Sequence, residues 1–306
     1  MSSGTKALML IVPLLAFGVG GGFYSPHEDS SWLEKSVQTQ LSLPELPAWA
    51  DAELPDFSQY RDTTEKKAAF FSFLYPRIVL ANYRILLERN YLESLSEKET
   101  LSKKERKWLA RQADRLRVSA EPGSTELIQQ LRHRLDVIPP SLILAQAANE
   151  SAWGTSRFAT KGSNLFGQWC FSRGCGLVPR ERKEGARHEV ATFESPYRSV
   201  RAYIENLNRH HTYKTLRNLR AQNRKDKELS GLELAQGLTG YSERGEAYVN
   251  EIRSIIQYNN LSFYDQDFGR AIRSVTPDRL LNMAKTVSAS SLLPGQSRQD
   301  TAKTES

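Results

Sequence analysis

Apolar side chains recur every three or four residues over most of the chain, which is the spacing of one helix face. The first such stripe begins near Glu65, and Pro76 interrupts it because proline has no backbone N–H to donate. A capping-box sequence at Ser102–Glu105 opens the next helix, and a further leucine stripe follows residue 125. Residues 62–124 are therefore predicted to form a helical N-terminal region whose apolar faces pack on another element.

The second half of the chain alternates helices with one short β segment. Pro140 starts a helix that Gly154 stops. Residues 176–193 lack the helical stripe and predict a β-hairpin. Helices resume at Ser195, and the last firm stripe ends near Ile256. The expected fold is mainly α, a helical domain with a small β-hairpin lobe behind the helical N-terminal region.

The two ends of the chain differ from its middle in their pattern of apolar and polar residues. An apolar run at positions 7–17, with Lys6 as the nearby positive charge, indicates a segment for export. No Ala-x-Ala cleavage pattern follows, so residues 1–25 are expected to be a cleaved signal peptide or a retained membrane anchor; a buried core helix is the alternative. Residues 26–61 are proline-containing and predict a linker, and residues 269–306 predict a largely disordered C-terminal tail. An exported and anchored chain would reside in the periplasm, on the inner membrane.

The composition, with 39% apolar and 25% charged residues, excludes a disordered chain, a polytopic membrane protein and a collagen-like fibre. Basic residues outnumber acidic ones by 42 to 35, and this net charge of +7 suits a nucleic acid, an anionic membrane or an acidic envelope polymer. The basic clusters, such as Arg217, Arg220 and Arg224, lie in helical stretches without a base-reading motif. They are expected to be solvated helix faces, and no nucleic-acid partner is predicted.

Two cysteines are too few for a disulfide framework or a four-thiolate zinc site. Cys170 and Cys175 flank a short turn that contains Gly174. An oxidising compartment would permit a disulfide between them, and two reduced thiols are the alternative. No spacing supplies two further ligands, so neither a metal nor a cofactor is predicted.

The densest chemical signal is Gln146–Gly154, followed by Asn164–Gly167. Helical spacing puts Gln146, Glu150 and Trp153 on one face. The negative end of the helix dipole, together with Trp153 and the neighbouring alanines, would raise the pKa of Glu150. A carboxyl that stays protonated near neutral pH can protonate a leaving oxygen, which is the acid half of glycosidic cleavage. An ordinary surface acid at the end of an alanine-rich helix is the alternative.

These motifs resemble the signature of the β-N-acetylglucosaminidase domain of glycoside hydrolase family 73, and in particular its periplasmic, Bax-like branch, in which a cysteine-containing loop follows the Asn-Leu-Phe-Gly turn. The resemblance continues through Ser195–Tyr197, Asn206–Asn208, Tyr213 and Gly240–Ser242. It covers roughly residues 125–262, within a domain placed at 125–268. It implies a lysozyme-like domain in which Glu150 is the catalytic acid.

The resemblance also implies a sugar-binding groove. Trp153, Phe166, Gly167 and Tyr241 match positions that line this groove or support it. Core packing is an equal alternative for Trp153 and Phe166, whereas the groove is favoured for Tyr241, which lies in a turn after Gly240.

Family members draw a second carboxylate from the β-lobe. Glu189 is the first choice because strand alternation puts it on the face of Phe193, and Glu181 is the second; Glu184 is expected to be a solvated turn residue. If neither reaches the site, the N-acetyl group of the substrate could replace the missing nucleophile.

The expected function is that of a peptidoglycan hydrolase that cleaves β-1,4 bonds after N-acetylglucosamine, with glycan strands and the inner membrane as partners. A lytic transglycosylase is the alternative among enzymes, because it also relies on one glutamate in a lysozyme-like domain. A catalytically weak wall-binding scaffold is the alternative outside them.

Overall fold

The structure is a computed structural model that describes residues 43–180, 182, 185–225, 229–273 and 275–295. The apolar segment 1–25, Glu181 and Glu184 lie outside the described residues. The helical elements, in chain order, are η1 (Phe57–Gln59), α2 (Thr63–Ser96), α3 (Lys103–Arg115), α4 (Thr125–Arg134), α5 (Pro140–Glu150), α6 (Arg157–Gly162), α7 (Pro196–Arg209), η2 (His211–Tyr213), α8 (Lys214–Lys225), α9 (Gly231–Leu234), η3 (Ala235–Leu238), α10 (Glu246–Tyr258), α11 (Ser262–Ile272), α12 (Pro277–Ala284) and η4 (Ala289–Leu292). The strands are β1 (Trp169–Cys170), β2 (Gly176–Leu177) and β3 (Glu189–Ala191).

A lysozyme-like helical domain with a small β-lobe is confirmed. The predicted hairpin is one part of an antiparallel sheet with the order β1-β3-β2. Val190 at its centre pairs with Trp169 on one side and with Leu177 on the other. β1 precedes the predicted hairpin because the turn at Asn164–Gly167 leads directly into a strand.

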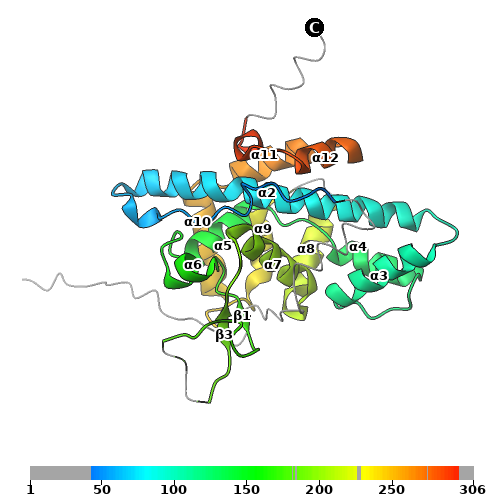
Figure 1. Ribbon diagram of the computed structural model, residues 1–306, viewed down its shortest axis with the longest axis horizontal. Coiled ribbons are helices and arrows are strands. Elements are labelled where there is room, and N and C mark those ends of the chain that lie inside the picture. The colour runs from blue at the N-terminus through cyan, green and yellow to red at the C-terminus, as the bar shows by residue number, and fades with distance from the viewer. Residues whose placement is uncertain (1–42, 181, 183–184, 226–228, 274, 296–306) are drawn as a thin grey trace, which may run out of the picture.

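The long helix α2 is the scaffold of the molecule. It lies across the whole structure, with α5 and α7 packed below it and α11 and α12 above it (Figure 1). The predicted interruption at Pro76 is wrong, because α2 continues through this residue. Proline removes one backbone donor, and the buried side chains of Leu74, Tyr75 and Ile78 on either side hold the helix together.

Residues 43–61 are not a linker, which corrects the prediction for this part of 26–61. Apart from η1 they form neither helix nor strand, but several of their apolar side chains are buried against the rest of the chain. Phe57 is 1% exposed and lies edge-on against Phe70, with ring centroids 5.4 Å apart. The Arg84 guanidinium donates to the carbonyl oxygen of Pro44 at 2.7 Å. The N-terminal region and the domain after residue 125 therefore share one hydrophobic core.

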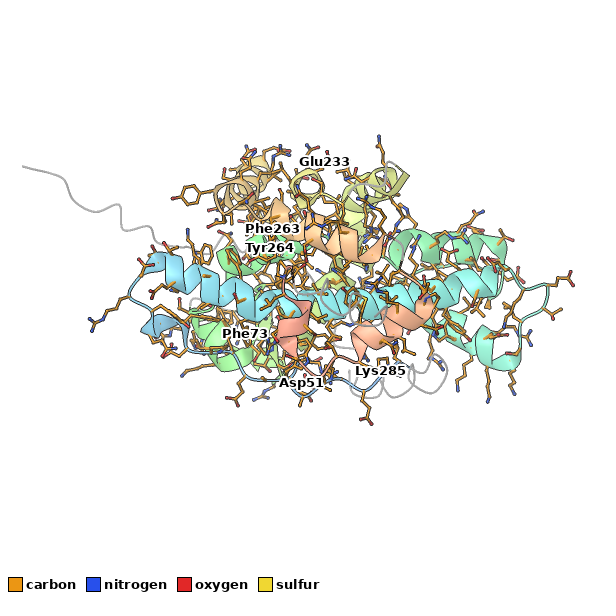
Figure 2. The ribbon with its side chains drawn as sticks, turned by 90° about the horizontal axis from the view of Figure 1, so that it is seen from above. Asp51, Phe73, Glu233, Phe263, Tyr264 and Lys285 are labelled. Atoms are coloured by element: carbon orange, nitrogen blue, oxygen red, sulfur yellow. A yellow bond between two sulfur atoms is a disulfide. The ribbon has the colours of Figure 1, made fainter. Side chains whose placement is uncertain are left out.

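The prediction of a disordered tail is wrong for residues 269–273 and 275–295, most of which are helical and packed on the rest of the chain. Thr276 caps α12 by accepting from the Arg279 backbone N–H at 3.3 Å, and Leu280 is buried against α2. The Trp49 indole donates to the carbonyl oxygen of Thr286 at 3.0 Å. Figure 2 shows the neighbouring Asp51 and Lys285 on the same side of α2. A helix of two turns carries too short a stripe to stand out in the sequence.

Two of the basic residues expected on a solvated face are buried instead. Arg217 is 2% and Arg220 is 3% exposed. The Arg217 guanidinium donates to the carbonyl oxygens of Leu207 and His210, both at 2.8 Å. Arg220 donates to the last carbonyls of α4 and lies beside the Asp136 carboxylate. A guanidinium has five donors and can satisfy several helix ends at once.

Within the described part of the chain, no helix is both long enough and apolar enough to cross a membrane.

Candidate active site

Glu150 is the last residue of α5, a helix that is buried along most of its length. The amino end of α5 has no side-chain cap of its own, and Asp265 of α11 supplies one. One Asp265 carboxylate oxygen accepts from the Ser141 backbone N–H at 2.8 Å, and the other accepts from the Ser141 hydroxyl at 2.5 Å and from the Gly231 N–H at 2.8 Å. α5 is thus capped at its amino end, opposite Glu150, by Asp265 of α11.

A chain of buried polar groups ends at the Glu150 carboxyl. The Tyr248 hydroxyl of α10 donates to Glu150 Oε1 at 2.7 Å and accepts from Gln146 Nε2 at 2.8 Å. The Gln146 Oε1 accepts in turn from the Tyr203 hydroxyl of α7. Gln146 and Glu150 lie one helical turn apart, so one face of α5 presents both groups to α10.

Burial raises the pKa of Glu150 to about 7, and the hydrogen bond from Tyr248 opposes this rise. The Glu251 carboxylate raises the pKa further, and the Arg244 guanidinium lowers it. The pKa of Glu150 is raised, as predicted, but the groups around its carboxyl differ from those expected. The aromatic groups that interact with the Glu150 charge are the tyrosines of α7, η2, α10 and the turn before α10: Tyr203, Tyr213, Tyr241 and Tyr248.

Trp153 does not share a helix face with Glu150, because α5 ends at Glu150. Ala152 and Trp153 take positive φ angles of 49° and 59°. The Trp153 ring turns towards α2 and meets Phe70 and Phe71 edge-on, with centroids 5.9 and 5.4 Å away. Of the two roles left open for Trp153, packing is therefore the one that these contacts support, although the ring remains partly exposed.

The glycine after Trp153 allows the N-terminal segment to approach this turn. Gly154 has a φ of 79°, and a Cβ added there would lie 2.6 Å from the Phe57 ring. Phe57 thus packs directly under the turn that follows Glu150.

The Asn-Leu-Phe-Gly turn organises the entrance to the β-lobe. The Asn164 amide donates to the carbonyl oxygens of Gln168 and Ala191, at 2.9 and 2.8 Å. Its oxygen accepts from the backbone N–H groups of Phe166 and Gln168. Gly167 has a φ of 62°, in the left-handed region that favours glycine. This motif therefore builds the backbone turn that joins α6 to the sheet.

Phe166 and Tyr241 pack against the two tyrosines of this polar chain. Phe166 is 2% exposed and stacks on Tyr203, with centroids 4.0 Å apart. Tyr241 is 6% exposed, donates to the Phe166 carbonyl oxygen at 2.9 Å and stacks on Tyr248 at 5.3 Å. The groove role favoured for Tyr241 is not what the structure shows, since both its hydroxyl and its ring are already engaged.

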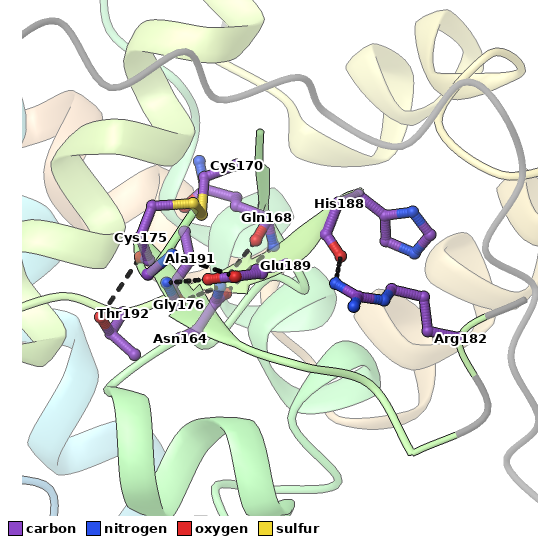
Figure 3. Close-up of a disulfide and its surroundings, with 11 residues drawn as sticks. Asn164, Gln168, Cys170, Cys175, Gly176, Arg182, His188, Glu189, Ala191 and Thr192 are labelled. Atoms are coloured by element: carbon purple, nitrogen blue, oxygen red, sulfur yellow. Dashed lines mark hydrogen bonds between the residues drawn. A yellow bond between two sulfur atoms is a disulfide. The ribbon is translucent and has the colours of Figure 1, made fainter. Parts of the chain in front are cut away.

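Glu189 holds the disulfide loop of the β-lobe (Figure 3). Cys170 and Cys175 are joined by a disulfide, so neither sulfur is a thiolate available to a metal. The Glu189 oxygens accept from the backbone N–H groups of Gly174 at 3.1 Å and Gly176 at 2.9 Å. These bonds lower the pKa of Glu189. Its carboxylate is committed to the loop, and this weakens its candidacy as the second catalytic group.

Sequence reasoning missed the roles of Tyr203 and Tyr248. Both residues lie in the apolar stripes of amphipathic helices, and their positions alone predicted core packing. It also missed the ion pair between Arg244 and Glu251, whose charged atoms are 2.7 Å apart and whose two charges act on the pKa of Glu150. The available signal was a tyrosine, with its polar hydroxyl, in a stripe of buried apolar residues. The partner of the Tyr248 hydroxyl, Glu150, lies about a hundred residues away in the sequence.

Two comparisons with known proteins find matches to this chain. Residues 125–261 match the glucosaminidase family, described as mannosyl-glycoprotein endo-beta-N-acetylglucosaminidase. The chain is also 37% identical over 211 residues to Protein bax of Escherichia coli (strain K12), across 68% of this chain and 75% of that protein. No solved structure matches the chain.

Proposed function

The chain belongs to the family of Bax-like proteins with a glucosaminidase domain, and from that premise we propose that it cleaves the β-1,4 bond after N-acetylglucosamine in peptidoglycan, with Glu150 as the general acid. The observation that carries the proposal is the partly exposed Glu150 carboxyl at the end of a buried helix, with a pKa of about 7. A carboxyl with this pKa is protonated in a large share of molecules at neutral pH and can protonate the leaving oxygen.

Tyr248 has a defined role in this proposal. When Glu150 gives up its proton, the new carboxylate keeps the hydrogen bond from the Tyr248 hydroxyl, which Gln146 orients. Burial keeps the pKa of Tyr248 well above its usual value, so the hydroxyl remains a donor. The product form of the acid is therefore stabilised at the moment when the glycosidic bond breaks.

As the group that attacks the anomeric carbon, we favour the N-acetyl oxygen of the substrate over a carboxylate of the protein. The N-acetyl oxygen forms a bond to the anomeric carbon while the glycosidic bond breaks. The leaving oxygen keeps the electrons of that bond and takes the Glu150 proton. Water then opens the resulting cyclic intermediate and returns a proton to Glu150. The commitment of both Glu189 oxygens to backbone N–H groups supports this choice, because it leaves them poorly placed to attack.

The proposal locates the enzyme in the periplasm, held at the inner membrane by residues 1–25. The apolar run at positions 7–17 and the disulfide between Cys170 and Cys175 support this location, since such a bond persists in an oxidising compartment.

Mass spectrometry of purified peptidoglycan digested with the full chain tests the activity. Products with a reducing N-acetylglucosamine end support the proposal, anhydro-sugar ends indicate a lytic transglycosylase, and binding without products indicates a scaffold. Glu150→Gln should reduce turnover by about 100-fold to 10,000-fold with the fold intact. Glu246→Gln, an exposed carboxylate in the first turn of α10, is the matched control and should keep wild-type turnover. Wild-type activity in a folded Glu150→Gln protein would rule out the assignment.

A further inference from the structure

Lys67 lies between two aromatic rings beside the catalytic turn. Its ammonium is 5.0 Å from the ring centroid of Trp153 and 5.0 Å from that of Tyr258. The three side chains come from α2, from the turn after α5 and from the last residue of α10. Within the described part of the chain, Lys67 has no carboxylate partner at ion-pair distance. Among the described residues, the two ring faces are the groups that the structure places against its charge.

This cluster is held in place on one side and open on the other. Trp153 is wedged against Phe70 and Phe71 of α2, so its ring cannot easily move. Tyr258 is 84% exposed, which is high for a large aromatic side chain, and its ring faces the Lys67 ammonium. An exposed aromatic face beside a cation is an arrangement suited to binding a ligand.

The cluster is also close to the proposed acid. Trp153 follows Glu150 by three residues, a backbone distance of at most about 11 Å even if fully extended. The Trp153 N–H donates to the Ala148 carbonyl oxygen at 2.9 Å, so the turn is folded back and the true separation is shorter. Figure 1 shows α10 passing behind α5 and reaching the level of α2. Tyr258 lies ten residues after Tyr248, about 15 Å along the axis of α10, so a ligand as long as a polysaccharide strand is needed to contact both Glu150 and these three residues.

We propose that Lys67, Trp153 and Tyr258 form a subsite that binds a carboxylate-bearing part of the glycan strand; this rests on the proposed function. Peptidoglycan carries carboxylates on the lactyl groups of its muramic acid residues and on its stem peptides. A lysine ammonium forms a strong charge-assisted hydrogen bond with such a group. The exposed Tyr258 face would pack on the adjoining sugar ring or peptide.

The subsite extends the binding surface beyond the matched family domain. Lys67 belongs to α2, whereas the family match begins at residue 125. The N-terminal helix thus contributes to substrate selection as well as to packing, and it favours natural wall strands over neutral N-acetylglucosamine polymers.

Equilibrium binding of uncleaved ligands to the full chain carrying Glu150→Gln tests this subsite. The ligands are a neutral N-acetylglucosamine oligomer, a peptide-free glycan strand with lactyl carboxylates, and a strand with stem peptides. Lys67→Gln should weaken binding of at least one carboxylate-bearing strand about 10-fold, and Tyr258→Ala should weaken the same strand, while the neutral oligomer binds Lys67→Gln as before. Lys66→Gln, at the adjacent lysine, is the matched control and should change none of the three affinities.

The two strands identify the source of the carboxylate. A loss for both points to the lactyl group, and a loss for the peptide-bearing strand alone points to the stem peptide. Unchanged binding of both strands by Lys67→Gln, an equal loss for the neutral oligomer, or no binding of any ligand would overturn the proposal. Because binding is measured without turnover, a Lys67-dependent affinity in a chain that releases no products would refute the proposed function and leave the subsite standing.

Discussion

The hydrogen bond between Tyr248 and Glu150 gives the sharpest test of the proposed acid. Tyr248→Phe keeps the ring that stacks on Tyr241 and removes only the hydroxyl that donates to Glu150 Oε1 at 2.7 Å. This hydrogen bond lowers the pKa of Glu150, because it stabilises the carboxylate more than the acid. Its removal should therefore raise the pKa.

The size of this rise follows from the strength of such bonds. A hydrogen bond to a charged group contributes about 1.5–3 kcal/mol, and about 1.36 kcal/mol corresponds to one pKa unit. The pKa of Glu150, about 7 in the wild type, should thus rise by about one to two units. Only the protonated acid is active, so wild-type turnover should fall as the pH rises through about 7. In Tyr248→Phe this fall should begin at a higher pH.

The maximal rate should change in the opposite sense. The carboxylate formed at bond cleavage loses the same stabilisation, so turnover at low pH should drop about 10-fold or more. The Gln146 amide also loses its acceptor, and this should cost about 1–3 kcal/mol of folding free energy.

The assay is the release of reducing ends from peptidoglycan between about pH 4 and about pH 10, a range that covers both pKa values. Circular dichroism checks that the variant is folded. Tyr91→Phe is the matched control, since Tyr91 packs on Trp108 of α3 and should leave the profile unchanged. An alkaline limb that stays in place or moves to lower pH in a folded Tyr248→Phe protein would refute the assignment of Glu150 as the titrating acid.

Four other variants or treatments probe the fold around the site. Gly154→Ala should lower the unfolding free energy by about 2–4 kcal/mol in urea titrations, because the new methyl meets the Phe57 ring in a left-handed backbone; an unchanged midpoint would contradict this packing. Asp265→Ala should cost about 3 kcal/mol in the same titration by leaving three donors at the start of α5 and α9 without an acceptor, and a loss below about 1 kcal/mol would argue against the cap. Glu189→Gln should lower the melting temperature of the protein while reducing turnover far less than Glu150→Gln does, and abolished activity in a folded variant would restore Glu189 as the second carboxylate. Thiol labelling of unfolded, unreduced protein should find no free cysteine, and label on both cysteines would show that the disulfide does not form.

Local patterns were enough to predict the helices that carry the proposed acid and its neighbours. Pro140 at the first position of α5 and Ser195 capping α7 are signals contained in a few adjacent residues, and the helices begin where those signals stand. The Ser102–Glu105 capping box is present as well. The position of Glu150 at a helix end was predictable for the same reason. The direction of its pKa shift was also predictable, because burial of a carboxyl raises its pKa.

The sequence by itself therefore determined the fold class, the motif and the acid at the end of α5. Only the tertiary structure decided what surrounds that acid: the Tyr248 hydroxyl that it accepts from, the Phe57 ring beneath its turn and the loop that occupies Glu189. It also decided that Pro76 lies within a continuous helix and that the C-terminal residues form α12. The physical reason is range. Capping and helical periodicity act over a few residues, whereas hydrogen bonds and ring contacts between distant segments depend on how whole helices pack.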